Sequence, residues 1–308
     1  MFPIEIVDEK IMDTIIEDND LRARGLCPVG KKMYCTEEKC LTNVKITNDV
    51  VGQGSGGIVY RACSVDDCSF VAKCSRDVEI SANEVLIQNA ASNYHLAPVI
   101  RQFLICKRMA IIIMDGLDKT VLQLLQRISP ENEERLIKKY LIEIHNVIEY
   151  MVLEEQIVVP KITTIKELMN FLYVMKLKIS YEYPTMDQTM IDASVPKFEI
   201  DFEDSEEEKK FKIDLVKRSF EKIHKLHQRG IYHGDLHFSN IMANSEGKLF
   251  IIDFGFSEFT KNKAEQKLDF LHAIKMLKSA CENSGRVNIQ YVVDYLVDLY
   301  ENFYRSQY

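Results

Sequence analysis

Two polar motifs on either side of a predicted β-hairpin constrain the fold of this chain more than any other feature. The first is His233-Gly-Asp235-Leu-His-Phe-Ser-Asn240, in which an aspartate precedes an asparagine by five residues. The second is Asp253-Phe-Gly255, which ends an apolar run 13 positions after Asn240. That interval accommodates two short strands and a turn, so the chain can return Asp253 to the neighbourhood of Asn240.

These residue types suit phosphoryl transfer from a nucleoside triphosphate. The reaction needs a carboxylate to orient the acceptor hydroxyl and hard oxygen ligands for a divalent cation. We expect Asp235 to be the catalytic carboxylate, and Asn240 and Asp253 to bind Mg²⁺ or Mn²⁺. In the motif family that this loop resembles, the histidine more often packs beneath the loop than transfers protons, so His233 is assigned that structural role. For His237 two alternatives stay open, contact with a phosphate or exposure to solvent.

A glycine-rich segment near the N-terminus supplies a candidate phosphate-binding loop. Its glycines match the pattern G-x-G-x-x-G at Gly52, Gly54 and Gly57, with Val51 before the pattern and Val59 after it. Glycine lets a turn approach phosphates without a Cβ atom in the way. The pattern alone also fits a dinucleotide-binding loop or a flexible turn. Strand-like residues on both sides, with no helix after Gly57, favour a loop between two strands.

Lys73 is the candidate cation for the phosphates. It ends Val71-Ala-Lys73, a strand-like segment 14 residues after Val59. Such a lysine is usually held by a glutamate on a helix. We choose Glu84, within a helix predicted over 81–91, because Glu79 follows Lys73 too closely for the chain to end a strand and begin a helix. The alternative for Glu84 is a solvated acid on that helix.

Together these motifs resemble the protein kinase superfamily, over about residues 46–125 and 211–280. The resemblance implies an α+β, bilobal fold with a small β-rich N-lobe and a mainly helical, truncated C-lobe. It also implies that ATP binds between the lobes, next to a hinge near Met114, Asp115 and Leu117, with Met114 as gatekeeper.

Departures from most protein kinases point to a minimal member. No Ala-Pro-Glu follows Gly255, and only 53 residues (308 − 255) remain after it. Gly234 replaces the usual arginine of His-Arg-Asp, so regulation by activation-loop phosphorylation is not expected. The chain is similar here to the RIO kinases and to the small kinase of the KEOPS complex, and that likeness implies that Asp269 braces the catalytic loop. Its composition also resembles kinases of large DNA viruses.

The predicted organisation has three parts. Residues 1–45 form an N-terminal extension with a helical pattern at 11–21, residues 46–115 form the N-lobe, and residues 116–308 form the C-lobe with an insertion at about 156–210. The acidic run at 199–210 is most simply a solvated loop or linker, with a basic partner as the alternative. Further helices are predicted at 120–155, 211–228 and 289–303.

Composition excludes several classes of protein. A formal net charge of −8 does not suit a general nucleic-acid binder. No apolar run approaches the roughly 20 residues that span a bilayer, and the N-terminus is acidic where a signal peptide would be cationic. We therefore expect a soluble, intracellular and cytoplasmic protein without membrane contact, virion-associated if the source is viral. The eight cysteines, among them Cys63 and Cys68, are expected to be reduced thiols, with structural zinc as the alternative.

Three functions follow from these expectations. The first is a serine/threonine protein kinase that transfers the γ-phosphate of ATP to protein hydroxyls, with further complex partners allowed. The second is a small-molecule kinase of the aminoglycoside or choline kinase type, in which the insertion at 156–210 binds the substrate. The third, a pseudokinase scaffold, is disfavoured because Lys73, Asp235, Asn240 and Asp253 are all present.

Overall fold

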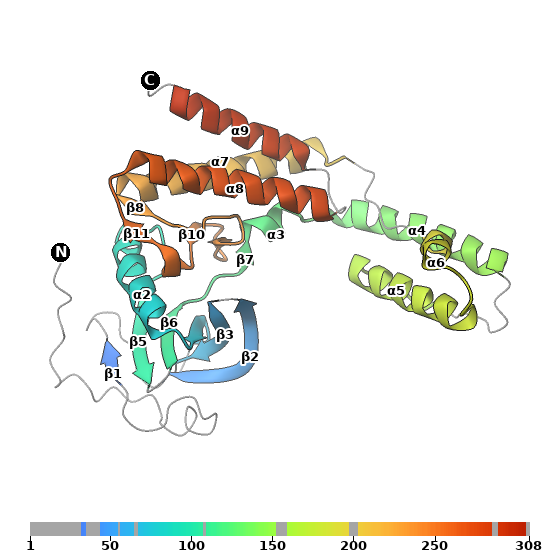
Figure 1. Cartoon of the computed structure of the whole chain (residues 1–308), viewed down its shortest axis with the longest axis horizontal. Helices are drawn as coiled ribbons and strands as arrows, with labels where there is room; N and C mark the ends of the chain where they lie inside the picture. The colour runs from blue at the N-terminus through green and yellow to red at the C-terminus, as the bar shows by residue number, and fades with distance from the viewer. Residues whose placement is uncertain are drawn as a thin grey trace. The chain divides into compact units, whose positions relative to one another are not determined.

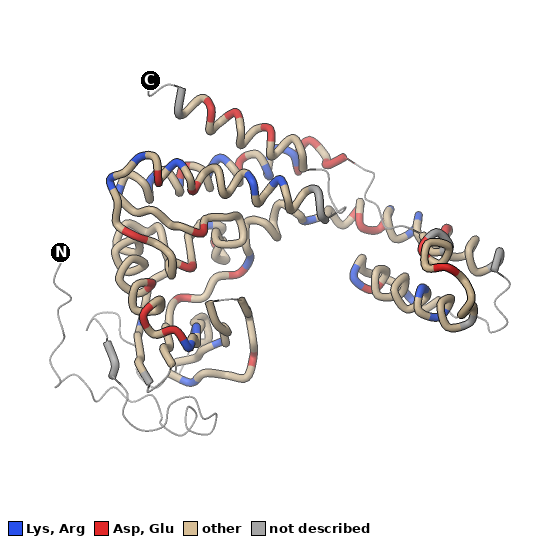
Figure 2. Tube along the Cα trace, viewed as in Figure 1, with Lys and Arg blue, Asp and Glu red and all other residues tan. Residues whose placement is uncertain are grey.

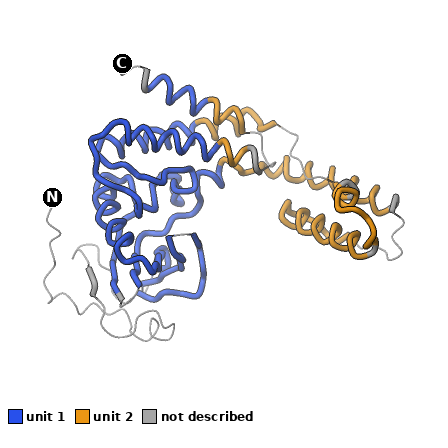
Figure 3. Tube along the Cα trace, viewed as in Figure 1, with its two compact units in different colours: residues 1–124, 214–277, 295–308 blue, residues 125–213, 278–294 orange. Residues whose placement is uncertain are grey.

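A computed structural model describes most of the chain, namely residues 32–34, 44–54, 56–64, 67–106, 109–151, 159–196, 203–284 and 289–305. The predicted helix at 11–21 lies outside these residues. The chain divides into two compact units, coloured in Figure 3. Unit 1 comprises residues 1–124, 214–277 and 295–308, and unit 2 comprises residues 125–213 and 278–294.

The N-terminal part of unit 1 is a six-stranded antiparallel sheet (Figure 1) in the order β1-β5-β6-β4-β3-β2. Its strands are β1 (Lys32–Tyr34), β2 (Lys45–Gly54), β3 (Gly57–Cys63), β4 (Phe70–Ser75), β5 (Ile100–Cys106) and β6 (Met109–Asp115). Helix α2 (Val78–Ser92) joins β4 to β5 and packs on this sheet.

Strand β6 shows why the sheet holds together. Its apolar run is continuous because side chains on both of its faces are buried. Ile111 and Ile113 belong to one hydrophobic cluster, whereas Ile112 and Met114 belong to a second cluster on the other face. Val85 of α2 packs against the second cluster, so the helix covers that face.

The rest of unit 1 contains short strands and helices. The strands are β7 (Lys119–Thr120), β8 (Ile231–Tyr232), β9 (Ile241–Ala243), β10 (Leu249–Ile251) and β11 (Glu258–Phe259). The helices are α3 (Val121–Leu125), the short 3₁₀ helix η2 (Phe254–Phe256), and the unit 1 parts of α7 (Glu206–Gln228), α8 (Lys263–Ser284) and α9 (Gln290–Arg305). The predicted hairpin after Asn240 is present, because β9 pairs with β10 with Ile241 opposite Ile251. A β-sheet N-terminal region and a helical C-terminal region confirm the α+β, bilobal fold.

Unit 2 has its own hydrophobic core. Its helices α4 (Pro130–Met151), α5 (Ile165–Glu182) and α6 (Gln188–Ser194) share one buried apolar cluster. Helix α5 contributes Leu168, Leu172, Met175 and Ile179, at spacings of three and four residues that put them on one face. Its N-terminus is fixed by a capping box in which the Thr164 hydroxyl accepts from the Glu167 N–H.

The acidic run at 199–210 differs from the predicted solvated loop. Its last five residues begin helix α7. Three glutamates lie in the first turn, where their negative charges interact favourably with the positive end of the helix dipole. Asp204 is buried, and its Oδ2 accepts hydrogen bonds from the Lys212 ammonium and the Tyr291 hydroxyl, each at 2.7 Å. Lys212 is itself fully buried, so the carboxylate offsets a charge that water cannot reach. Acidic and basic residues are otherwise interspersed along both units (Figure 2).

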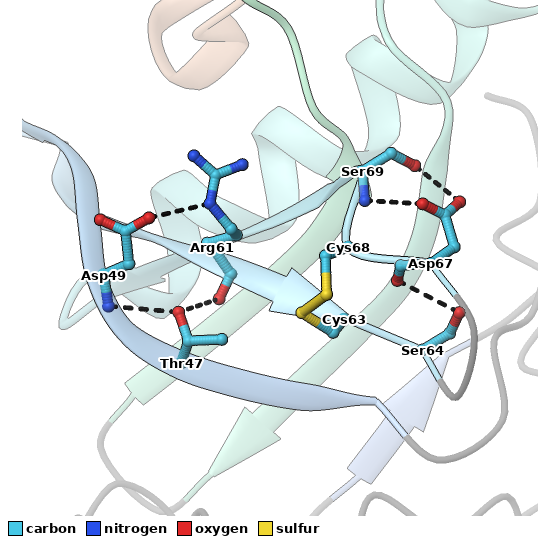
Figure 4. Close-up of a disulfide and its surroundings, with 8 residues drawn as sticks. All are labelled: Thr47, Asp49, Arg61, Cys63, Ser64, Asp67, Cys68 and Ser69. Carbon is cyan, nitrogen blue, oxygen red and sulfur yellow. Dashed lines mark hydrogen bonds and ion pairs between the residues drawn. A yellow bond between two sulfur atoms is a disulfide. The ribbon is translucent and has the colours of Figure 1, made fainter.

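The prediction of reduced thiols is wrong for one pair. Cys63 and Cys68 form a disulfide at the turn between β3 and β4 (Figure 4). The antiparallel register places Ala62 opposite Phe70, which brings the two adjoining strand ends together. Asp67 supports this turn, since its carboxylate accepts from the Ser69 N–H at 2.8 Å. Three of the other cysteines, Cys27, Cys35 and Cys40, lie outside the described residues.

No helix among the described residues is both long and apolar enough to cross a membrane.

Candidate active site

The ammonium of Lys73 lies at the centre of the candidate site. Its Nζ atom is 2.8 Å from each carboxylate oxygen of Glu84 and 2.7 Å from Oδ1 of Asp253. Lys73 and Glu84 are 8% and 2% exposed, so this ion pair is shielded from water. The fold thus brings together three residues from β4, α2 and the segment after β10.

Local structure explains why Glu84 reaches the lysine. Strand β4 pairs with β3 and β6 so that Lys73 stands between Val59 and Ile112. The chain needs only two residues to end β4 and start α2, because Asp77 caps the helix by accepting from the Ile80 N–H at 2.9 Å. Glu79 falls in the first turn of α2 and is exposed, whereas Glu84 falls on the buried face.

Electrostatics hold Lys73 in its charged form. Burial opposes its charge, but the carboxylates of Glu84 and Asp253 outweigh burial, and the pKa of Lys73 lies above its ordinary value. Burial raises the pKa of Glu84, and the ammonium of Lys73 offsets part of that rise. A carboxylate this far from water is stable as an anion only beside a cation. Lys73 is therefore an ammonium at neutral pH, the form that binds phosphate oxygens.

The glycine-rich segment lies over this ammonium. Val51, Gly52 and Gly54 are in β2, and Gly57 and Val59 are in β3. Gly56, which the G-x-G-x-x-G pattern does not single out, is the glycine nearest the charges. A Cβ atom there would lie 3.1 Å from Nζ of Lys73 and 3.6 Å from Oδ1 of Asp253. Glycine at 56 therefore keeps the space above the ammonium open. The sequence feature that could have indicated Gly56 is the presence of four glycines within residues 52–57.

The loop that carries Asp235 is fixed from beneath by Asp269 of α8. The buried Asp269 carboxylate accepts from the His233 N–H at 2.8 Å and the Gly234 N–H at 3.1 Å, and His227 Nε2 lies 2.9 Å from the same group. Gly234 has a φ of 82°, and a Cβ atom there would collide with the Phe256 carbonyl oxygen. The backbone therefore excludes an arginine at this position.

His233 is fully buried and both of its ring nitrogens have partners. Nε2 lies 2.9 Å from the Ile252 carbonyl oxygen, to which it donates, and Nδ1 accepts from the Asp235 N–H at 3.3 Å. Only the neutral ring can make both bonds. Burial also lowers the pKa of His233. Its neutral ring joins the loop to Ile252, the residue directly before Asp253.

Asp235 and Asn240 are held next to one another. The side-chain amide of Asn240 donates to the Asp235 carbonyl at 2.9 Å, and the Ile252 N–H donates to the Asn240 carbonyl at 2.9 Å. These two bonds tie the loop to the residue before Asp253. Asn240 is 7% exposed, while the Asp235 side chain is 38% exposed. The catalytic carboxylate candidate is thus accessible and the amide is not.

Two further residues near this centre were not predicted from the sequence. Asn83 of α2 donates its side-chain amide to the Gly255 carbonyl at 3.2 Å and to the Ser257 carbonyl at 2.9 Å. His272 of α8 has Nδ1 4.0 Å from Oδ1 of Asp235. Two sequence positions could have indicated these residues. Asn83 directly precedes Glu84, and His272 lies one helical turn after Asp269.

The predicted hinge residues lie at and just after the end of β6. Met114 is buried, is opposite Val71 in β4, and has its sulfur 3.4 Å from Nε2 of Gln88. The Asp115 carboxylate accepts from Arg101 at 2.7 Å. Leu117 follows two residues after Asp115, before the short strand β7.

The donor set fits a magnesium ion. Asp253 has a left-handed backbone, with φ of 66°, and its Oδ1 contacts Lys73 while the side chain is 35% exposed. The Asn240 amide nitrogen is used by Asp235, which fixes the orientation of its oxygen. Hard carboxylate and amide oxygens are ligands that Mg²⁺ accepts. Within the described ranges, no group of three or more His, Cys, Asp or Glu side chains forms a separate metal cluster.

One comparison with known proteins matches part of this chain. Residues 160–276 match the model of the protein kinase domain. The match covers less than half of the chain, and it includes Asp235, Asn240, Asp253 and Asp269 but not Lys73 or Glu84. No curated protein matches the chain. Residues 160–276 are thus similar to a protein kinase domain, and the N-terminal sheet brings a buried Lys–Glu pair to Asp253 within the same unit.

Proposed function

We propose that this protein is a serine/threonine protein kinase of minimal design, which uses ATP and Mg²⁺. One observation carries the proposal: the buried ammonium of Lys73 contacts both Glu84 and Asp253, in the arrangement that a kinase uses to bind phosphates. The match of residues 160–276 to a protein kinase domain supports ATP-dependent phosphoryl transfer. The preference for serine and threonine follows the likeness to minimal kinases.

Each residue has a distinct part in the proposed mechanism. Lys73 binds phosphate oxygens of ATP below the glycine-rich segment, with Gly56 leaving the space for them. Asn240 and Asp253 would hold Mg²⁺, which when bound neutralises charge on the phosphates. Asp235 accepts the proton of the acceptor hydroxyl while the acceptor oxygen attacks the γ-phosphorus and ADP leaves.

The open surroundings of Asp235 favour a protein acceptor over a small molecule. Phe256 and Phe259, which follow Asp253, are 62% and 54% exposed, and Leu268 of α8 is 52% exposed. A site for a small molecule is usually a concave pocket that covers most of its ligand. Exposed apolar side chains on the segment after Asp253 and on α8 suit contact with a longer polypeptide segment.

Labelled ATP tests the proposal directly. The full chain is incubated with Mg²⁺ and γ-labelled ATP, and it is offered casein, its own chain, or a panel of aminoglycosides and choline. We expect label on serine or threonine of protein, and at least a 100-fold lower rate for Asp235→Asn. Asp214→Asn is the matched control, because Asp214 is an exposed carboxylate on α7 that pairs with Arg218.

The acceptor that carries the label decides between the alternatives. Label on small molecules alone would replace the proposal with a small-molecule kinase. Nucleotide binding without any transfer would indicate a scaffold. Label on tyrosine would retain the kinase and reject its serine/threonine preference.

A further inference from the structure

Two imidazole rings flank the carboxylate of Asp235, one at each oxygen. Nε2 of His237 lies 3.9 Å from Oδ2, and Nδ1 of His272 lies 4.0 Å from Oδ1. The ring centroids are 6.3 Å apart and the rings are nearly perpendicular. His237 belongs to the loop that carries Asp235, whereas His272 comes from α8. The two oxygens of the carboxylate therefore face different neighbours.

The position of His272 is fixed by buried contacts of its own helix. Asp269, three residues earlier on α8, is 1% exposed and binds the N–H groups of His233 and Gly234. Ala273, directly after His272, is also buried. Residues three apart on a helix lie on neighbouring faces. Because Asp269 attaches α8 to the loop next to Asp235, His272 is directed to the same carboxylate.

The space between His272 and Asp235 fits one oxygen atom. A separation of 4.0 Å between Nδ1 and Oδ1 is too long for a direct hydrogen bond. A single oxygen can nonetheless lie about 2.8 Å from both atoms, since twice that length exceeds their separation. The two side chains are 36% and 38% exposed, so an incoming hydroxyl can reach this position.

We propose that His272 positions the acceptor hydroxyl jointly with Asp235, an inference that rests on the proposed kinase function. The hydroxyl points its hydrogen to Oδ1 of Asp235, and Nδ1–H of His272 donates to one lone pair of the acceptor oxygen. The remaining lone pair faces the γ-phosphorus. As the new P–O bond forms, the proton passes to Asp235, and the bond to the β–γ bridging oxygen breaks with its electron pair leaving on ADP.

His237 is less suited to this part. Its side chain is only 21% exposed. Its backbone is fixed within the loop, because the main-chain carbonyl oxygen of His237 accepts from the Asn240 N–H at 2.8 Å. Its ring faces Oδ2, the other carboxylate oxygen. The acceptor hydroxyl therefore binds at Oδ1 of Asp235, the carboxylate oxygen next to His272 of α8.

Isosteric variants of His272 test the proposal in the full chain. An asparagine at 272 places an amide N–H near the former Nδ1, whereas a leucine of similar size offers none. With casein as acceptor, we expect His272→Leu to lower kcat/KM for casein roughly 100-fold and His272→Asn to retain most of it. The affinity for ATP, measured by nucleotide fluorescence, stays at the wild-type value in both. Lys275→Ala, an exposed change one turn further along α8, is the control and keeps wild-type kinetics.

Each contrary result has a distinct meaning. Wild-type transfer by His272→Leu overturns the inference and leaves the kinase function intact. Equal losses in the leucine and asparagine variants also overturn it, since the N–H would then be irrelevant. Failure of the wild-type chain to label protein while it binds ATP instead overturns the proposed function.

Discussion

Nζ of Lys73 lies 2.7 Å from Oδ1 of Asp253, although the two residues are 180 positions apart in the chain. The same ammonium binds Glu84, so one cation joins β4, α2 and the segment that follows β10. Asn83 adds two hydrogen bonds from α2 to that segment.

Removal of Lys73 alone should destabilise the fold. Lys73→Met leaves the carboxylate of Glu84, which is 2% exposed, without its cation, and an unpaired buried charge costs about 3 kcal/mol or more. We expect the double variant Lys73→Met/Glu84→Leu to regain much of that loss, although neither variant transfers phosphate. Urea denaturation measures the free energies of unfolding.

Lys248→Met is the control for this pair, because Lys248 and Glu246 form an exposed ion pair and its loss should change stability by less than about 1 kcal/mol. A double variant that is no more stable than Lys73→Met would show that the buried pair does not determine the loss.

Asn83→Ala should reduce the rate of phosphoryl transfer more than it reduces stability. The substitution removes the amide that binds the carbonyl groups of Gly255 and Ser257, and α2 is then less firmly held against the segment after Asp253. We expect about 1 kcal/mol of lost stability and roughly a tenfold lower kcat. Glu79→Ala, an exposed change in the first turn of the same helix, should cost only about 0.5 kcal/mol of stability and leave kcat unchanged. An Asn83→Ala rate equal to wild type would contradict the positioning role.

Asp269→Ala should weaken both the fold and the reaction. Two backbone N–H groups, of His233 and Gly234, lose their acceptor in a buried place, at a cost of about 3 kcal/mol in the free energy of unfolding. Asp269→Asn retains one acceptor oxygen and should lie between wild type and alanine. Thermal or urea unfolding, together with the transfer rate, measures the series. Asp298→Asn, at an exposed position of α9, is the control.

The buried His233 should make the protein less stable in acid. Burial lowers its pKa below the ordinary value near 6.5, so the folded state resists a proton that the unfolded state accepts. The contribution of His233 to the free energy of unfolding is therefore complete above about pH 6.5, and it is lost as pH falls through that value towards the pKa of His233 in the folded state. The slope reaches at most about 1.4 kcal/mol per pH unit for this one group.

Urea denaturation of wild type and His233→Gln between pH 7.5 and pH 5 tests the sign. Glutamine does not titrate, so the variant should lose stability less steeply than wild type even if it is weaker throughout. Parallel pH profiles for the two proteins would refute the assignment.

The sequence determined the identity and order of the chemical groups in this protein. Local spacing was sufficient to predict that Asp235 and Asn240 share one loop and that Asp253 follows a hairpin. These residues are separated by only five and 13 positions, so short-range structure places them. The α+β, bilobal fold was confirmed, and residues 160–276 match a protein kinase domain. The roles assigned to Lys73 and the metal ligands stay predictions.

Tertiary structure alone decided which distant groups meet. The contact of Asn83 with Gly255 and Ser257, and that of His272 with Asp235, depend on how α2 and α8 pack, which no local pattern specifies. The Cys63–Cys68 disulfide depends on the strand register across a turn, and Asp204 is buried where it pairs with the buried Lys212. Periodicity predicts that a helix forms, whereas its neighbours are set by the burial of apolar faces across the whole chain.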